Sequence, residues 1–498
     1  MQSQALLVPA EKRYLFLTAP EWRIGLLLSA MAGAVAAWMS LFISVWIGVT
    51  VFLVTLTAYH MRYAARYIIP FPHIAIMISA LQYVFAAWVS FYYPTEDPTY
   101  NIGYDLPFYL SYAGPVIAAI CVGWSLSLRG IKPKIQPVLL QSHQPLIELD
   151  ILLMVGLVAQ VVGPHVQLPG LGFVLVLVAN LRYVGVYGRM LARAPGWTWR
   201  LAIVLASEVL FAAETGMFHP LLLWLCWSGA VWMYCVKPNL RGVLCVLLAG
   251  TLFLPAFQEA KWRMRGASDD DLVGPDPTEI AAQNTLTRTV TFLSYLTGSL
   301  KHAATLDMSD RFIADTAVRY NQGWIVNRIM FFVPSFEPYS KGSTIKSAVM
   351  AALLPRVVAQ QKLESGGVEQ MARYAGMELS EGTSMNLGYA GEMYANFGFI
   401  GGIVGCGVYA LFFGLLFRWV CNKAFSNPFW WTVMPYIFFA ALKAEDGIDY
   451  ALNWTVKSFV IIAGLYLILP GFRAALRGHQ PPPVACLPVS LKEHPSEA

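Results

Sequence analysis

The chain has 498 residues, of which 57% are hydrophobic, 14% aromatic and 13% charged, and its mean hydropathy is +0.55. A soluble domain carries about 25% charged residues, so this composition excludes a cytosolic enzyme, a disordered chain and a secreted disulfide scaffold. It predicts an all-α polytopic membrane protein. The net charge of +5 excludes little by itself, whereas the distribution of charge along the chain predicts the topology.

Apolar stretches of membrane-crossing length occur about twelve times along the chain. Residues 24–59 are too long for one span, so we divide them near Ser40. The predicted spans cover about 24–40, 42–59, 71–92, 108–128, 150–166, 169–187, 201–217, 219–236, 242–257, 393–417, 428–444 and 450–470. This pattern divides the chain into an N-terminal membrane bundle (1–257), a large, mostly helical loop subdomain (258–388), C-terminal membrane spans (389–470) and a tail (471–498).

Lys and Arg residues predict the orientation of these spans. With the N-terminus inside, 18 of the 21 Lys and Arg residues outside 258–388 fall in inside segments, and the others are Arg182, Lys443 and Lys457. Arg182 lies near an inner end, from which its side chain could snorkel to the interface. We therefore expect a multi-pass membrane protein with both termini cytoplasmic and residues 258–388 outside the cytoplasm.

Cysteine and histidine spacing gives no sign of a metal site. The seven Cys lie in or near spans or in the tail, none of them in 258–388, and no CxxC or HxxxH pattern occurs. We therefore expect no metal ion and no other cofactor. The lipid bilayer is the expected surrounding, and nucleic acid is not an expected partner.

The candidate site residues begin with two arginines in the polar segment. Residues 308–333 are predicted to be helical. Arg319 and Arg328 are nine positions apart, which places them on different faces of a continuous helix, so a break near Gly323 is needed for them to converge. Trp324 precedes Arg328 by four positions and could stack on its guanidinium.

A turn-rich loop at 333–344 follows, because two Pro, a Gly and several hydroxyl residues occur close together. It brings Glu337, Tyr339 and Lys341 near one another in sequence. These three side chains are candidates for contact with a polar or charged substrate.

A further helix is predicted at 345–363, bent by Pro355. Arg356 comes directly after this proline and is a third candidate arginine. The alternative for residues 345–354 is an amphipathic helix that lies on the membrane surface.

Acidic and amide residues occur where the chain re-enters the membrane. Glu392 and Asn396, in the Gly-rich stretch 381–402, are four positions apart and therefore share one helix face. Asp446 belongs to an acidic turn between the last two spans. Ionisable groups in or near membrane spans are commonly functional.

Four pieces of the chain, in this order, resemble the oligosaccharide repeat-unit polymerases (the O-antigen polymerase, or Wzy-type, group). The pieces are RYNQGWIVNRIM (319–330), VPSFEPYSKG (333–342), LLPR (353–356) and EGTSMNLGYAGEMYANFGFIGG (381–402). The resemblance implies a membrane glycosyltransferase that polymerises undecaprenyl-diphosphate-linked oligosaccharides into O-antigen or exopolysaccharide. It also implies the bacterial inner membrane as the location, with residues 258–388 and the reaction on the periplasmic face. A chain-length-regulating membrane protein would be a partner. Outer-loop arginines matter in this group, which implicates Arg319, Arg328 and Arg356.

The chemistry of such a transfer favours the same residues. A glycosyl group that leaves a lipid diphosphate adds negative charge to it, and cationic groups must stabilise that charge. No Asp-x-Asp pair accompanies a polar groove, so arginine forks are the expected substitute for a metal ion. The acceptor hydroxyl needs a general base, for which the candidates are Glu337, Glu392 and Asp446. Lys341, Tyr339 and Asn396 complete the predicted substrate-binding set.

Three alternatives stay open. An O-antigen ligase would share the arginine-bearing loop, and such ligases usually present a loop histidine, for which only His302 is available. A flippase or exporter of lipid-linked sugars would place its charged groups at the bilayer midplane rather than at one rim. A non-catalytic scaffold for envelope assembly would tolerate loss of the arginines.

Overall fold

The computed structural model contains only helices as regular secondary structure within the residues that it describes. These are residues 22–41, 44–95, 100, 104–129, 131, 146–166, 171–215, 219–237, 242, 253, 256–257, 259–260, 263–264, 285–305, 310–353, 367–379 and 385–477. Eight helices within these ranges are long and apolar enough to cross a membrane: Val45–Ala64 (α2), Phe71–Tyr92, Leu106–Leu128 (α5), Leu146–His165, Gly172–Leu191, His219–Val236 (α10), Gly388–Ser426 (α18) and Ile448–Ile468 (α20).

Three of these eight spans contain more than one element. Phe71–Tyr92 consists of α3 (Phe71–Ala80), a π-helical turn η1 (Leu81–Phe85) and α4 (Ala86–Tyr92); Leu146–His165 consists of α6 (Leu146–Val162) and η3 (Gly163–His165); Gly172–Leu191 contains α7 (Gly172–Ala179) and α8 (Leu181–Leu191). The other elements are α1 (Trp22–Met39), α9 (Trp197–Thr215), α13 (Thr285–Thr305), α14 (Asp310–Tyr320), α15 (Gly323–Phe332), α16 (Ser343–Leu353), α17 (Val368–Ala375), α19 (Trp430–Ile437), η4 (Ala440–Leu442) and α21 (Pro470–Arg477).

The structure confirms a helical, membrane-embedded protein. Helices α1 and α9 occupy predicted spans, although neither is among the eight helices. Most of the predicted span 242–257 lies outside the described residues. The predicted break between Arg319 and Arg328 is present, because α14 ends at Tyr320 and α15 begins at Gly323.

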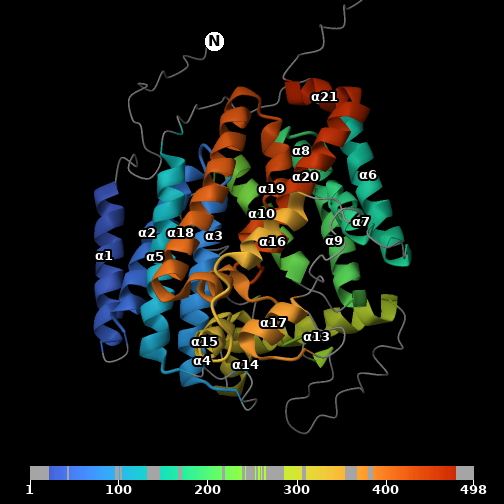
Figure 1. Cartoon of the computed structure of the whole chain (residues 1–498). Coiled ribbons are helices and arrows are strands. Elements are labelled where there is room, and N and C mark those ends of the chain that lie inside the picture. Colours follow the sequence, from blue (N-terminus) through green and yellow to red (C-terminus); the bar gives the residue numbers. More distant parts are fainter. Residues whose placement is uncertain are drawn as a thin grey trace, which may run out of the picture.

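Helices from the predicted loop segment cover one end of the bundle. Helices α13, α14, α15 and α17 lie at this end, which we term the capped end, and α21 lies at the opposite end (Figure 1). Helix α16 behaves differently, because it packs along α20. Thr344, Ala348 and Ala352 form its buried face, whereas Val349, Met350 and Leu353 are exposed, so α16 contacts the bundle through one face only.

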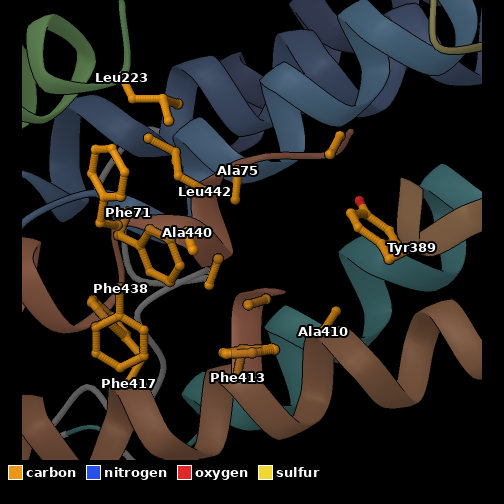
Figure 2. Close-up of a cluster of buried hydrophobic side chains, with 14 of the residues drawn as sticks. Phe71, Ala75, Leu223, Tyr389, Ala410, Phe413, Phe417, Phe438, Ala440 and Leu442 are labelled. Atoms are coloured by element: carbon orange, nitrogen blue, oxygen red, sulfur yellow. The ribbon is translucent and has the colours of Figure 1, made fainter. Parts of the chain in front are cut away.

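An aromatic core joins the N-terminal and C-terminal membrane helices. The Phe71 ring lies 5.2 Å from Trp124, 5.3 Å from Trp227, 5.4 Å from Phe417 and 5.1 Å from Phe438, measured between ring centroids. Figure 2 shows Phe71, Phe417 and Phe438 beside one another in this core. Such large buried rings dominate packing energetics, so the spans on either side of the loop segment form one body.

A buried ion pair connects two helices of the N-terminal bundle. Arg182 of α8 donates to Glu208 of α9, and the two residues are only 2% and 3% exposed. Arg182 also donates to the Ala179 carbonyl at 2.6 Å. The side chain therefore finds an anionic partner inside the bundle and does not snorkel to the interface, because the carboxylate is within direct reach.

Helix α18 is interrupted at Gly398, where φ is +70° and ψ is −163°. Its 39 residues, at about 1.5 Å per residue, would otherwise far exceed a membrane core of about 30 Å. The predicted span 393–417 crosses this interruption. The helix therefore consists of a short first half, residues 388–397, and a long second half, residues 399–426.

The predicted span 428–444 is interrupted as well. The chain leaves the α-helical conformation after Ile437 and continues through the short turn η4. The carbonyls at the interruption accept hydrogen bonds from α20, because Trp454 Nε1 lies 2.8 Å from the Tyr436 oxygen and Thr455 Oγ1 lies 3.3 Å from the Ile437 oxygen. Irregular backbone at membrane depth requires such internal partners.

We expect Gly398→Ala to destabilise the protein by about 1–3 kcal/mol, because this backbone conformation is essentially restricted to glycine. A Cβ would also lie 3.0 Å from the Tyr339 ring. Thermal unfolding of the purified protein in detergent measures the loss. Gly464→Ala in α20 is the matched control, since a Cβ there meets nothing within 4 Å. Equal unfolding temperatures for the two variants would contradict the prediction.

Candidate functional site

The carboxylate of Glu392 joins three helices at the centre of the candidate site. One of its oxygens accepts a hydrogen bond from Thr344 Oγ1 at 2.7 Å, and the other accepts from the backbone N–H of Ile448 at 2.8 Å. Thr344 lies in the first turn of α16, and Ile448 is the first residue of α20. Both partners are therefore at helix N-termini, where a negative charge is favoured. Glu392 is completely buried.

Asn396 extends this arrangement by one helical turn. Its amide nitrogen donates to Thr344 Oγ1 and to the Glu392 carbonyl, each at 2.7 Å, and its side-chain oxygen accepts from the Gly342 N–H at 2.9 Å. The four-residue spacing thus places Glu392 and Asn396 on one face, as expected, and that face contacts the start of α16. We call Thr344, Glu392 and Asn396 the buried junction.

The turn-rich loop 333–342 closes the end of the first half of α18. The N–H of Ser340 donates to the Ala395 carbonyl at 2.9 Å, and the N–H of Lys341 donates to the Asn396 carbonyl at 3.1 Å. These bonds satisfy carbonyls that the interruption at Gly398 leaves without helical partners. Tyr339 and Lys341, both predicted binding residues, therefore lie beside the interruption.

Tyrosine hydroxyls hold the same half-helix from its other side. Tyr83, in the π-helical turn η1, donates to the Ala444 carbonyl and accepts from the Ala390 N–H at 3.4 Å. Tyr112 of α5 donates to the Ala390 carbonyl at 2.8 Å. The Tyr389 hydroxyl is hydrogen-bonded to Ser79 at 2.7 Å. The position of residues 388–397 is therefore fixed by helices of the N-terminal bundle.

A second set of polar side chains lies next to the buried junction. It surrounds Glu445, in the segment between η4 and α20. His219 Nδ1 is 2.9 Å from Glu445 Oε1, and Gln322 Nε2 donates to Glu445 Oε2 at 3.4 Å. Lys443 Nζ lies 3.2 Å from Asp446 Oδ1 and 3.8 Å from Glu445 Oε1. We call His219, Gln322, Lys443, Glu445 and Asp446 the Glu445 cluster. A Cβ on Gly388 would lie 3.0 Å from the Ala444 carbonyl, so the cluster adjoins α18.

Burial and charge oppose each other in this cluster. Lys443 lies between the carboxylates of Asp446 and Glu445, whose negative charges compensate the burial of its ammonium group. Burial raises the pKa of Asp446, and the nearby Lys443 charge partly opposes that shift. Asp446 Oδ2 is shielded from solvent and has no hydrogen-bond partner within the described residues. A buried acceptor of this kind is costly unless a ligand satisfies it.

Glu337 lies in a different environment from the other predicted bases. Its carboxylate accepts from Arg373 Nε of α17 at 2.6 Å, and the Arg373 side chain is 53% exposed. This hydrogen bond raises the pKa of Arg373. The structure thus pairs Glu337 with a surface arginine of the capped end and places it outside the buried junction.

The three predicted arginines also differ in their surroundings. Arg328 Nε donates to the Ala375 carbonyl at 2.7 Å and its Nη2 to the Gly376 carbonyl at 3.4 Å, so its guanidinium caps the C-terminus of α17. Arg319 lies in the last turn of α14 and is half-buried. Arg356 lies outside the described residues.

Sequence reasoning missed Thr344 and the participation of His219 and Gln322. Thr344 follows Ser343 in a segment that also contains Ser340, and these hydroxyl residues could have indicated a helix cap. His219 and Gln322 carry no comparable local signal. They meet Glu445 from positions more than 100 residues apart, and only tertiary packing brings them together.

Comparisons of the chain with protein-family models, with curated proteins and with solved structures find no match. Within the described residues, no group of three or more His, Cys, Asp and Glu side chains is placed to hold a metal ion. Function is therefore inferred from the residues and from their arrangement.

We expect Thr344→Val to destabilise the protein by about 1–3 kcal/mol, because it leaves a Glu392 oxygen and one N–H of the Asn396 amide without a buried partner at nearly constant volume. Thr344→Ser keeps the hydroxyl and is expected to lose much less. Thermal unfolding in detergent compares the two variants. The buried junction would have no stabilising role if the valine and serine variants unfolded together with the wild type.

Proposed function

We propose that this protein is a membrane glycosyltransferase that polymerises lipid-diphosphate-linked oligosaccharide repeat units into a cell-surface polysaccharide, at the periplasmic face of a bacterial inner membrane. One observation carries the proposal: pieces that resemble repeat-unit polymerases in sequence contact one another in space. Residues 340–342 bond to Ala395 and Asn396, and α15 packs against α18. Of the remaining piece, 353–356, only Leu353 belongs to the described residues.

The proposed topology has twelve spans, with residues 258–388 periplasmic and both termini cytoplasmic. Two features support it. The helices of the loop segment gather at the capped end, whereas α21, with Arg473 and Arg477, lies at the opposite end (Figure 1). Basic residues beyond the last span favour the cytoplasmic side. The polar groups of the site lie between these helices and the apolar bundle, where a lipid-linked substrate would meet both.

The proposed chemistry is attack of an acceptor sugar hydroxyl on the anomeric carbon of the donor, with departure of the lipid diphosphate. Arg319, Arg328 and Arg356 stabilise the charge of the leaving diphosphate, which needs no metal ion. Arg328 uses two nitrogen atoms to donate hydrogen bonds to the carbonyls at the end of α17. A guanidinium has five N–H groups, so other N–H groups of Arg328 are available to bind phosphate oxygens.

The candidate carboxylates take different roles in this proposal. Glu392 is fully buried and both of its oxygens are bonded to protein, so we assign it to positioning α16 and α20. Glu337 is engaged by Arg373. Asp446 retains an oxygen without a partner among the described residues, and it therefore belongs with substrate contact.

The first experiment is elongation by the purified protein in nanodiscs, with a lipid-diphosphate-linked repeat unit from the source organism as substrate and EDTA present. We expect a ladder of longer lipid-linked glycans. Transfer to a lipid A core without a ladder would instead identify a ligase. Movement of the same lipid across sealed vesicles without a ladder would identify an exporter.

We expect Arg319→Ala and Arg356→Ala each to lower kcat by about 10²–10³-fold, the usual cost of removing one donor to a developing negative charge. The assay is ladder formation at equal protein concentration. Arg418→Ala is the matched control, because Arg418 lies in the second half of α18 and donates to the Arg129 carbonyl at 2.9 Å. Wild-type rates in both loop variants would remove these arginines from the site.

A further inference from the structure

A histidine that the predicted site did not include has the surroundings of a general base. His219 is the first residue of α10, and its Nδ1 lies 2.9 Å from the Glu445 carboxylate. An ionised carboxylate only accepts hydrogen bonds, so Nδ1 carries the proton and donates it. The neighbouring ammonium group of Lys443, 3.8 Å from the same carboxylate, favours that ionised form. The lone pair of the neutral imidazole is therefore on Nε2.

The Nε2 atom of His219 has an acceptor lone pair that is unused within the described residues. It is shielded from solvent, and no hydrogen-bond partner for it occurs within the described residues. The side chain as a whole is 34% exposed and that of Glu445 is 24% exposed, so this part of the cluster borders the protein surface. In many enzymes a carboxylate holds one ring nitrogen of a histidine, and the other ring nitrogen removes the proton from a hydroxyl nucleophile.

Other atoms of the Glu445 cluster have the same unmet hydrogen-bonding capacity. Asp446 Oδ2 and Gln322 Oε1 are both shielded from solvent and lack a partner among the described residues. The Asp446 side chain is only 6% exposed. Two acceptors beside an imidazole match a polyol, because each sugar hydroxyl can donate one hydrogen bond and accept others.

We propose that the Glu445 cluster binds the acceptor sugar and that His219 Nε2 removes the proton from its attacking hydroxyl. This inference rests on the proposed function and names the base of that same site. The hydroxyl O–H bond breaks as its proton moves to Nε2, and the oxygen forms a bond to the anomeric carbon. The bond from that carbon to the diphosphate oxygen breaks, and its electron pair stays on the diphosphate. The imidazolium then returns its proton to the released diphosphate or to water.

Glu445 is a positioning residue in this proposal. It holds the imidazole ring and fixes the protonated nitrogen, and it does not touch the reacting atoms. Gln322 and Asp446 contact the acceptor, and Lys443 holds Asp446 through the 3.2 Å contact. All of these groups come from three segments, at 219, 322 and 443–446, that the fold brings to one place.

The test uses the full-length protein in nanodiscs and the elongation assay described above, with a lipid-diphosphate-linked repeat unit as probe. We expect His219→Gln to lower kcat by about 10²–10⁴-fold, the usual contribution of a general base, with KM little changed. Added imidazole is expected to restore part of the rate to His219→Ala, which a purely structural histidine would not show. Glu445→Gln should lower kcat as well, without a matching change in KM.

His165→Gln is the matched control, because His165 ends η3 and is exposed, so its rate should equal that of the wild type. Wild-type elongation together with an unimpaired His219→Gln variant would overturn this inference and leave the polymerase proposal intact. Absence of elongation by the wild type would overturn the proposed function itself. Loss of activity in His219→Ala that imidazole does not restore, with a lowered unfolding temperature, would assign His219 a structural role and also overturn the inference.

Discussion

A peptide group that leaves its helix inside an apolar bundle has no water with which to bond, so the protein itself must supply a partner. This requirement governs both interruptions of the C-terminal helices. At Gly398, the N–H groups of Ser340 and Lys341 bond to the carbonyls of the preceding turn. After Ile437, the side chains of Trp454 and Thr455 do the same. The interruptions are stable because loop and helix supply these partners.

The same partners assemble the candidate site. The loop that closes the first half of α18 leads directly into α16, whose first turn bonds to Glu392. The chain that leaves α19 carries Lys443, Glu445 and Asp446 before α20 begins. Each interruption therefore places polar residues where a continuous helix would have carried an apolar stripe.

The site combines two sets of polar side chains that differ in whether their hydrogen bonds are satisfied by the protein. The buried junction is internally satisfied, since every oxygen of Glu392 has a protein partner, and it holds α16, α18 and α20 together. The Glu445 cluster is incompletely satisfied, with shielded atoms on His219 and Asp446 that lack partners among the described residues. Ligand-binding groups must be held in fixed positions by the residues around them. The buried junction supports the neighbouring Glu445 cluster in this way.

The sequence by itself determined the helical membrane class, most span positions, the break between Arg319 and Arg328 and the shared face of Glu392 and Asn396. Each of these follows from hydropathy or from local helical period, which neighbouring residues set. Only the tertiary structure decided that Gly398 breaks α18, that α16 packs on α20 and that His219 meets Glu445. These depend on contacts between segments far apart in the chain, for which local spacing carries no signal.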